Sequence, residues 1–411
     1  MRPGLYVHVP FCSAICPYCD FAVRVGDAAD GAGFVDSLLV ELNGLATGDA
    51  LSDLPAVATA VSRLVAGEFG RFDTIYLGGG TPSVLAERDL RRLLEALRER
   101  LPVDDDVKFF FEANPEDVTA QSLRLWNDLG VSMLSLGIQS FDSDQLRFLG
   151  RRHHADEARR AVQMALEAGF DTVSIDLIYG LPGQTEDAWR RELETAAHLD
   201  PQHLSCYELE IHPRTVFGKR SARGELRELS EDDQADLFLL THRHLAEHGF
   251  EGYEVSNFAR SPEHRSAHNA KYWHHVPYLG LGPSAHSYAP TGEGGVRWWN
   301  ERHTRRWARS LGEGRAAVDD HEALSFGDLA FEALMLGLRT VDGVDCRRLE
   351  RDFGVDILTG HAKQIEIWRV QGLVTRTDHR IRPTVAGMAL ADRLVTDLQL
   401  EHEITTEIDR A

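Results

Sequence analysis

The regular alternation of strand-like and helix-like segments over the first half of the chain constrains the fold most. Six segments rich in β-branched or aromatic residues have the character of strands, at 5–9, 73–77, 107–111, 132–138, 171–178 and 203–209. Amphipathic helical patterns lie between them, and the clearest puts leucines on one face at Leu90, Leu93, Leu94, Leu97 and Leu101. Such strand–helix units need right-handed crossovers, so we expect an α/β fold with a parallel sheet, as an open or partial barrel or doubly wound.

The rest of the chain divides into further predicted parts. Residues 45–70 are longer than a crossover requires and are rich in Ala, Gly and Leu, which predicts an additional helix. A glycine-containing stretch at 310–324 is typical of a linker between residues 1–309 and 325–411. In 325–411, helical patterns precede two short strand-like runs around Thr377-Asp378-His379, which predicts a mostly helical, winged-helix-like domain.

Composition and charge exclude several classes of function. The chain has 411 residues, 43% hydrophobic and 27% charged, which is typical of a globular protein with a large core. No apolar run reaches eighteen residues and the first residues lack a signal-peptide pattern, so we expect a cytoplasmic protein. The net charge of −21 argues against a nucleic-acid partner. The arginines at 302, 305, 306 and 309 are interpreted as a solvated helix face.

Three of the five cysteines lie within eight residues, as Cys12, Cys16 and Cys19. Their C-x3-C-x2-C spacing suits three corners of a [4Fe–4S] cube, whose fourth iron then lacks a protein ligand and can bind a small molecule. The alternative is structural zinc, which needs a fourth ligand such as His8. We expect His8 to point away from the thiols because it lies on the incoming strand.

This loop, from Tyr6-Val7-His8-Val9-Pro10-Phe11-Cys12 to Cys19-Asp20-Phe21, resembles that of the radical SAM superfamily. The resemblance implies a partial (β/α)6 barrel with a [4Fe–4S] cluster on Cys12, Cys16 and Cys19. It also implies that S-adenosylmethionine binds the free iron through its amino and carboxylate groups. In that superfamily the reduced cluster would supply an electron that cleaves the sulfonium, and the resemblance implies the same chemistry here.

Polar or glycine residues follow the predicted strands, where functional groups collect in parallel sheets. These runs include Gly78-Gly79-Gly80-Thr81, Phe111-Glu112 and Gly137-Ile138-Gln139. Each residue alone could equally stabilise the fold. The resemblance assigns the following residues to S-adenosylmethionine: Tyr6, Tyr18, Gly79, Gly80, Thr81, Glu112, Gln139, Arg151 and Asp176.

Within the superfamily, the chain resembles the oxygen-independent coproporphyrinogen III dehydrogenases and their relatives, the heme chaperones called HemW. The dehydrogenases have a fourth cysteine two residues after the third and a long N-terminal extension; here that position is Phe21, and eleven residues precede Cys12. The run His268-Asn269-Ala270-Lys271-Tyr272-Trp273 matches the H-N-x-x-Y-W pattern with which the chaperones bind heme. A neutral imidazole is a common axial ligand of heme iron, and aromatic rings can flank a macrocycle.

The resemblance therefore implies a heme chaperone that passes heme to apo-hemoproteins, with His268, Asn269, Tyr272 and Trp273 as heme contacts. The histidines at 264, 274, 275 and 286 remain alternative ligands. An electron donor is implied if the cluster is cycled, and peripheral membrane contact and a homodimer stay open. The rival functions are decarboxylating oxidation of coproporphyrinogen III and a binding module with a degenerate cluster loop.

Overall fold

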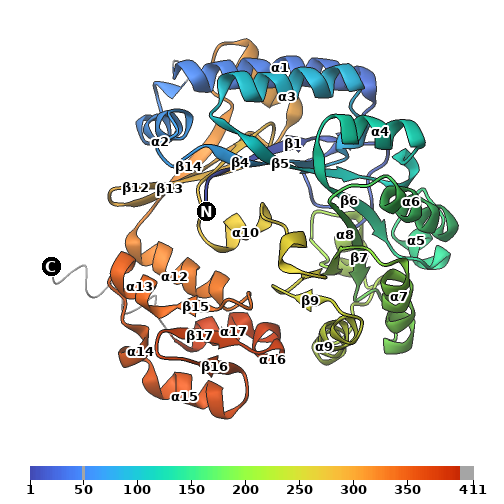
Figure 1. The fold of residues 1–411 in the computed structure, drawn as a ribbon, viewed down its shortest axis with the longest axis vertical. Coiled ribbons are helices and arrows are strands. Elements are labelled where there is room, and N and C mark those ends of the chain that lie inside the picture. The colour runs from blue at the N-terminus through green and yellow to red at the C-terminus, as the bar shows by residue number, and fades with distance from the viewer. Residues whose placement is uncertain (49–50, 399–411) are drawn as a thin grey trace.

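A twelve-stranded sheet with a parallel centre dominates the fold (Figure 1). The computed structural model of the protein describes residues 1–48 and 51–398. Six parallel strands lie in chain order at its centre: β1 (Gly4–Val9), β4 (Phe72–Gly79), β5 (Val103–Ala113), β6 (Val131–Gln139), β7 (Thr172–Tyr179) and β8 (His203–Glu208). They coincide with the six strands expected from the sequence, so the prediction of a partial (β/α)6 barrel is confirmed.

Further strands extend the sheet at both edges. Beside β1 lie the parallel strand β11 (Tyr278–Leu281) and the antiparallel strands β12 (His286–Thr291), β13 (Gly294–Asn300) and β14 (Val318–Leu324). Beside β8 lie the antiparallel strands β10 (Asn257–Ala259) and β9 (Glu251–Gly252). The two edge strands, β14 and β9, are not paired with each other, so the barrel is open.

Amphipathic helices cover the outer side of the curved sheet (Figure 1). In α3 (Glu87–Arg100), four of the leucines that predicted the helix are buried in the core cluster of the sheet. The predicted helices at 155–168 and 186–199 are α6 (Ala155–Glu167) and α7 (Glu186–Leu199). The other helices around the sheet are α1 (Ala28–Thr47), α2 (Pro55–Val65), α4 (Ala120–Asp128), α5 (Ser143–Phe148), α8 (Val216–Ala222), α9 (Glu231–Glu247) and α11 (Thr304–Gly312), with 3-10 turns at Pro82–Val84, Pro115–Asp117 and Pro262–His264.

The additional helix expected within 45–70 is α2, which begins with a proline at its first turn. A different short helix, α10 (Asn269–Trp273), lies on the inner side of the sheet, inside the arc of strands (Figure 1). Its Lys271 ammonium donates hydrogen bonds to the Arg2 carbonyl, at 2.7 Å, and to Asp73. These contacts hold α10 against the amino-terminal ends of β1 and β4.

The C-terminal part has its own hydrophobic core, formed by residues from Ala330 to Leu398. The expected hairpin is present as β16 (Val374–Arg376) and β17 (Arg380–Pro383), which β15 (Val344–Asp345) extends to three strands. The surrounding helices are α12 (Phe326–Gly337), α13 (Cys346–Phe353), α14 (Ile357–Gly360), α15 (Ala362–Val370), α16 (Val385–Ala389) and α17 (Ala391–Asp397). This mostly helical domain with a small sheet is the arrangement that the sequence predicts.

The segment expected as a linker, 310–324, differs from that expectation. Its first residues complete α11, and Val318–Leu324 form β14, which pairs with β13 at the edge of the large sheet. Of the glycines that suggested a linker, Gly312 is the last residue of α11 and Gly314 lies in the turn that follows it. The separate cores still support a proposed division near residue 325.

Within residues 1–48 and 51–398, no helix is both long enough and apolar enough to cross a membrane.

Candidate functional site

The cysteine loop follows β1 at the carboxyl end of the parallel strands. Cys12 ends the short strand β2 (Phe11–Cys12), which pairs with β3 (Arg24–Val25), so the pair closes the base of the loop. The Cys19 amide donates to the Cys16 carbonyl at 3.1 Å, and the Phe217 amide on α8 donates to the Pro17 carbonyl at 2.9 Å. The loop is therefore fixed from both within and outside.

The donor set of the loop fits an iron–sulfur cube. All three thiols are free and partly exposed, and burial raises the pKa of Cys12 and raises that of Cys19 to about 11. Binding iron must therefore displace thiol protons. No three Cys, His, Asp or Glu side chains in the described part of the chain are arranged around one metal ion. A cube needs no such convergence, because each thiolate binds a different iron.

The zinc alternative loses its fourth ligand in this structure. The two ring nitrogens of His8 lie 3.1 Å from the Tyr6 hydroxyl and 3.1 Å from the Ala22 carbonyl. His8 thus connects β1 to the end of the cysteine loop, and both of its ring nitrogens already have hydrogen-bond partners.

The glycine run after β4 lets that strand approach the loop closely. A Cβ atom at Gly80 would lie 2.5 Å from the Phe11 carbonyl oxygen and 2.7 Å from that of Val9. The Gly80 amide donates to the Val9 carbonyl at 2.8 Å, and the Thr81 amide donates to the Phe11 carbonyl at 2.6 Å. Only glycine permits this approach, which places Thr81 beside Cys12.

Glu112, at the end of β5, is held by two donors from β4. The Tyr76 hydroxyl donates to one carboxylate oxygen at 2.6 Å, and the Gly79 amide donates to the other at 3.2 Å. Burial, together with the charge of Asp176, raises the pKa of Glu112 to about 7, although the Tyr76 hydrogen bond favours the charged form. A carboxylate beside a glycine run is suited to bind an ammonium group.

Arg151 joins the cysteine loop to two further strand ends. Its terminal nitrogens donate to the Cys16 sulfur at 3.6 Å, the Asn114 side chain and the Gly137 carbonyl, while its buried Nε has no partner. Asn114 donates to Thr81 at 3.0 Å, and the Thr81 hydroxyl donates to the Cys12 sulfur at 3.5 Å. The unpartnered Nε leaves a donor for an anionic ligand such as a carboxylate.

The remaining predicted residues lie around this centre. Asp176 on β7 accepts the Ser135 hydroxyl at 3.0 Å, and burial raises its pKa to about 6. Gln139 has a φ of 66°, a strained conformation for a residue other than glycine. Tyr6 lies 6.0 Å from Tyr76 between ring centres, and Tyr18 packs on Phe217 of α8 at 6.4 Å.

His268 of the H-N-x-x-Y-W run lies deep inside the barrel, with 1% of its surface exposed. Its Nδ1 is 2.9 Å from the Thr74 hydroxyl, and its Nε2 is 2.9 Å from the Tyr272 hydroxyl. Burial lowers its pKa to about 3, so the ring is neutral. Gly4 makes room for this packing, because a Cβ there would lie 2.8 Å from Lys271.

The other residues of the motif and the alternative histidines are less buried. Asn269, Tyr272 and Trp273 are half-buried on α10. Three of the alternative histidines are engaged: His264 with Thr172, His275 with Glu332, and His274 weakly with Asp342. His286 is exposed and stacks on Trp299.

Several residues of the site were not predicted. Tyr76 lies in β4 and Asn114 directly follows β5, and the polar character of these positions could have indicated them. Asp20 accepts hydrogen bonds from Arg214 at 2.6 Å and is also bound by Arg302, so Arg302 is tied to the cysteine loop and the solvated-face interpretation is wrong for it. These two arginines come from opposite edges of the sheet, a contact that only the fold reveals.

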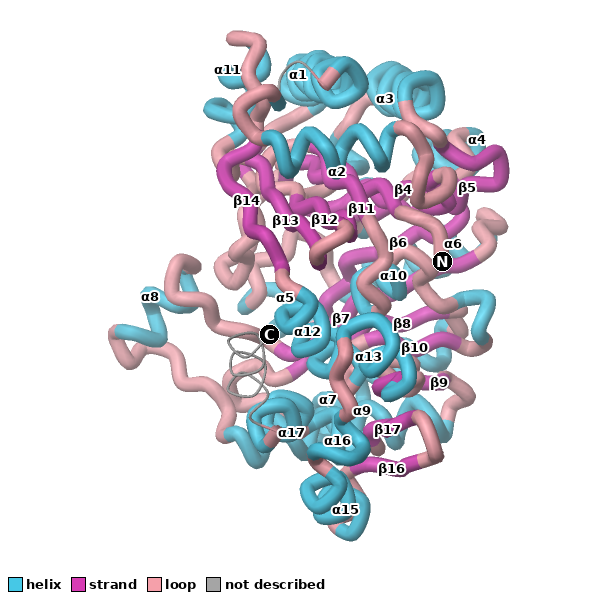
Figure 2. Tube along the Cα trace, turned by 90° about the vertical axis from the view of Figure 1, so that its left-hand side faces the viewer, coloured by secondary structure: helices cyan, strands magenta, loops and turns pink. Residues whose placement is uncertain are grey.

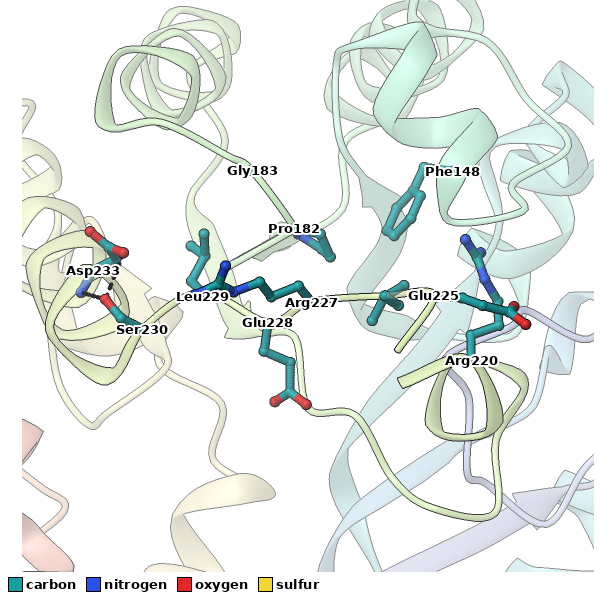
Figure 3. A pocket seen from close by; sticks show the side chains of 11 residues that line it. Phe148, Pro182, Gly183, Arg220, Glu225, Arg227, Glu228, Leu229, Ser230 and Asp233 are labelled. Carbon is teal, nitrogen blue, oxygen red and sulfur yellow. Dashed lines mark hydrogen bonds between the residues drawn. The ribbon is translucent and has the colours of Figure 1, made fainter. Parts of the chain in front are cut away.

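A separate cavity of about 470 Å³ lies beside α8 (Figure 3). Its walls include Phe148, Pro182 and Leu226 together with charged residues from Arg220 to Asp233. Phe148 and Leu226 also belong to the apolar cluster that supports Tyr18. None of its walls comes from the predicted cofactor residues, so it is distinct from the candidate site.

Comparisons with known proteins agree with this geometry. The Radical SAM superfamily matches residues 6–196, and the HemN C-terminal domain matches residues 324–390. In solved structures, the coproporphyrinogen III oxidase HemN from Escherichia coli has a TM-score of 0.76 at 23% identity, covering 97% of this chain and 90% of that one. This likeness concerns the fold.

Curated relatives extend the similarity over nearly the whole chain. The heme chaperone HemW of Lactococcus lactis is 33% identical, covering 96% of this chain and 97% of the relative. HemW of Bacillus subtilis is 30% identical over 95% and 97%, and HemW of Escherichia coli is 36% identical over 74% of each chain. The chain therefore belongs to the HemW family within the radical SAM superfamily.

Proposed function

We propose that this chain is a heme chaperone, which binds heme and transfers it to apo-hemoproteins of the respiratory chain with the help of a [4Fe–4S] cluster and S-adenosylmethionine. The observation that carries the proposal is the position of the H-N-x-x-Y-W run. Its His268 lies on the inner side of the sheet, against the same strand that ends in the glycine run. The names of the relatives support the same function.

In this proposal, Cys12, Cys16 and Cys19 hold the cluster, which supplies an electron at its free iron when it is reduced. Glu112 and Gly79 bind the ammonium group of S-adenosylmethionine, and Arg151 binds its carboxylate through the Nε that has no partner. The family resemblance implies that five further residues complete this site: Tyr6, Tyr18, Thr81, Gln139 and Asp176. An external electron donor and a cytoplasmic location belong to the same proposal.

His268 is proposed as the ligand of heme iron, with Asn269, Tyr272 and Trp273 around the macrocycle. Its low pKa keeps a lone pair on the imidazole at physiological pH, which is the form that binds iron. Because the buried imidazole shares its Nε2 with the Tyr272 hydroxyl, this hydrogen bond must break and the imidazole must leave its position before it binds iron. The heme site is therefore one that opens on binding.

The test combines heme titration and a turnover assay on one anaerobic preparation that contains the cluster. We expect saturable heme binding and no oxidation of coproporphyrinogen III with S-adenosylmethionine and a reductant. His268→Ala should weaken heme binding by at least the roughly 10- to 100-fold that disturbing a metal site's outer contacts costs. The matched control is His198→Ala, which removes an exposed histidine of α7 outside the motif and outside the alternative ligands. Appreciable porphyrinogen product, or equal heme affinity in His268→Ala, would contradict the proposal.

A further inference from the structure

Tyr76 on β4 contacts both the H-N-x-x-Y-W run and the carboxylate of the proposed S-adenosylmethionine site. Its hydroxyl donates to Glu112 at 2.6 Å. Its ring centre lies 5.0 Å from that of His268, with the planes tilted by 36°. One side chain thus connects the two sites directly.

The surroundings of Tyr76 leave its ring little freedom. Phe110 stacks on it at 5.9 Å with an angle of 11° between planes. A Cβ atom at Gly78 would lie 2.6 Å from Tyr76 Cε1 and 2.8 Å from the Glu112 carboxylate, so ring and carboxylate together fill the space above that glycine. Close packing of this kind transmits a displacement rather than absorbing it.

His268 cannot bind iron where it lies. Both ring nitrogens already have partners at 2.9 Å, Thr74 and Tyr272, and the side chain is almost completely buried. Ligation of heme iron therefore requires the imidazole to leave this position. Its departure removes the ring that packs against Tyr76 on the side of α10.

We propose that S-adenosylmethionine and heme bind this chain antagonistically, with Tyr76 as the positioning residue that couples the two sites. The inference rests on the proposed function and adds its regulation. With His268 in place, Tyr76 is held against Glu112 and its donated hydrogen bond favours the charged carboxylate, the form that binds an ammonium group. With His268 displaced, Tyr76 loses this packing contact, and its hydrogen bond to the Glu112 carboxylate is weakened. Each ligand therefore favours a different position of His268.

The antagonism gives S-adenosylmethionine a part in heme release. Because coupling between two binding equilibria is reciprocal, a ligand that stabilises the inward position of His268 weakens the hold on heme by the same factor. Filling of the S-adenosylmethionine site then promotes delivery of heme to an acceptor.

The experiment measures the S-adenosylmethionine Kd of cluster-containing protein with and without saturating heme, and the heme Kd with and without S-adenosylmethionine. We expect each ligand to weaken the other by the same factor, about tenfold. In Tyr76→Phe, which keeps the ring but loses the hydroxyl, this factor should fall close to one while both ligands still bind. Tyr179→Phe, a control at a ring that packs on Trp189 of α7 and belongs to neither site, should keep the wild-type factor.

Two substitutions of His268 separate coupling from a purely structural role. His268→Phe keeps a ring against Tyr76 and should preserve affinity for S-adenosylmethionine, whereas His268→Ala should lower that affinity severalfold even without heme. If heme binds through His268 and leaves the S-adenosylmethionine Kd unchanged, the coupling is refuted and the proposed function stands. If the wild-type protein binds no heme, both proposals fall. The Kd measurements on the wild-type protein distinguish these outcomes even if a variant fails to fold.

Discussion

At the scale of single residues, polar contacts connect the thiols of the cysteine loop to the ends of three neighbouring strands. Arg151 contacts Cys16, Asn114 and the Gly137 carbonyl, and Asn114 reaches Cys12 through Thr81. Each donor in this series faces a sulfur or an oxygen that is partly or fully buried. The contacts therefore fix the orientation of two of the three thiols before any cluster is bound.

Cys16→Ser should abolish cluster assembly, because a serine hydroxyl is a much poorer iron ligand than a thiolate and two thiolates cannot hold three corners of the cube. The measurement is the iron–sulfur absorbance and the iron content after anaerobic reconstitution. The matched control is Cys346→Ala, which changes a buried cysteine in the C-terminal core and should leave the cluster intact. A normal cluster spectrum in Cys16→Ser would remove Cys16 as a ligand.

The raised pKa of Glu112 predicts that the affinity for S-adenosylmethionine depends on pH. Since burial raises its pKa to about 7, its carboxyl is mostly protonated at pH 6 and mostly charged at pH 7.5. The affinity for S-adenosylmethionine should rise severalfold over this range. Glu112→Gln should bind more weakly and show a flatter pH profile. An unchanged profile in Glu112→Gln would assign the titration to another group, such as Asp176.

The same raised pKa affects folding stability. The folded state binds the Glu112 proton more tightly than the unfolded state, whose carboxyl pKa is near the ordinary 4.5. Its stabilising contribution is therefore complete below that ordinary value and is lost as the pH rises through about 7. Denaturant unfolding of protein without the cluster should show a smaller loss of stability over this window in Glu112→Gln than in the wild type.

At the scale of structural elements, the close approach of β4 to the cysteine loop depends on Gly80. A methyl group at this position would meet two backbone carbonyls, which cannot move aside as a flexible side chain could. Gly80→Ala should therefore cost about 1–3 kcal/mol of stability and reduce cluster incorporation. Gly33→Ala is the matched control: the site lies in α1 with no atom within 4 Å, and it should gain about 0.5–1 kcal/mol. Equal cluster content in the two variants would contradict this role of Gly80.

Helices and strands could be predicted from the sequence where local residue patterns determine them. The six strands and the leucine face of α3 follow from periodicity, and the hairpin near Thr377 follows from turn residues. The strand β14 was missed because its sequence, Val318-Asp319-Asp320-His321-Glu322, is polar and its two acids at 319 and 320 face solvent at the edge of the sheet. Its pairing with β13 is a tertiary contact that local propensity does not encode.

The site was predictable as far as the family motifs extend. The cysteines, the glycine run and Glu112 lie at the carboxyl ends of neighbouring parallel strands, as expected, and Arg151 contacts Cys16 from the segment between α5 and α6. The burial of His268 and its hydrogen bond to Thr74 were not predictable, because 194 residues separate the two in sequence. The contacts of Arg214 and Arg302 with Asp20 were likewise not predictable, because they depend on how the sheet curves.

At the scale of the whole molecule, the C-terminal domain is attached to the barrel next to the H-N-x-x-Y-W run. Glu332 on α12 binds Arg297 of β13 at 2.7 Å and His275 at 3.0 Å. Arg348 donates to the His274 carbonyl, and Glu254 and Thr340 form a bridge between the two parts. In Figure 2, α12 lies directly below the lower end of β14, and α13 lies beside it. The C-terminal domain therefore borders the segment that must open for heme.

Glu332→Gln should loosen this attachment, because it removes the charge that pairs with Arg297 while only 18% of the Glu332 side chain is exposed. Hydrogen bonds to charged groups contribute about 1.5–3 kcal/mol. We expect faster amide hydrogen exchange in residues 269–276 and in α12, with no change in β6 and β7. Glu366→Gln, which breaks an exposed pair with Arg369 on α15, is the control and should leave the exchange unchanged. Equal exchange in both variants would refute the attachment role of Glu332.

The proposed chemistry depends on three cysteines that hold a [4Fe–4S] cube whose fourth iron is free for S-adenosylmethionine. Electron paramagnetic resonance of the dithionite-reduced, reconstituted protein, recorded with and without S-adenosylmethionine, tests it most directly. We predict the signal of a reduced [4Fe–4S] cluster that changes shape when S-adenosylmethionine is added, because the ligand binds the free iron. A signal that stays the same on addition, or zinc bound in place of iron, would contradict the proposal.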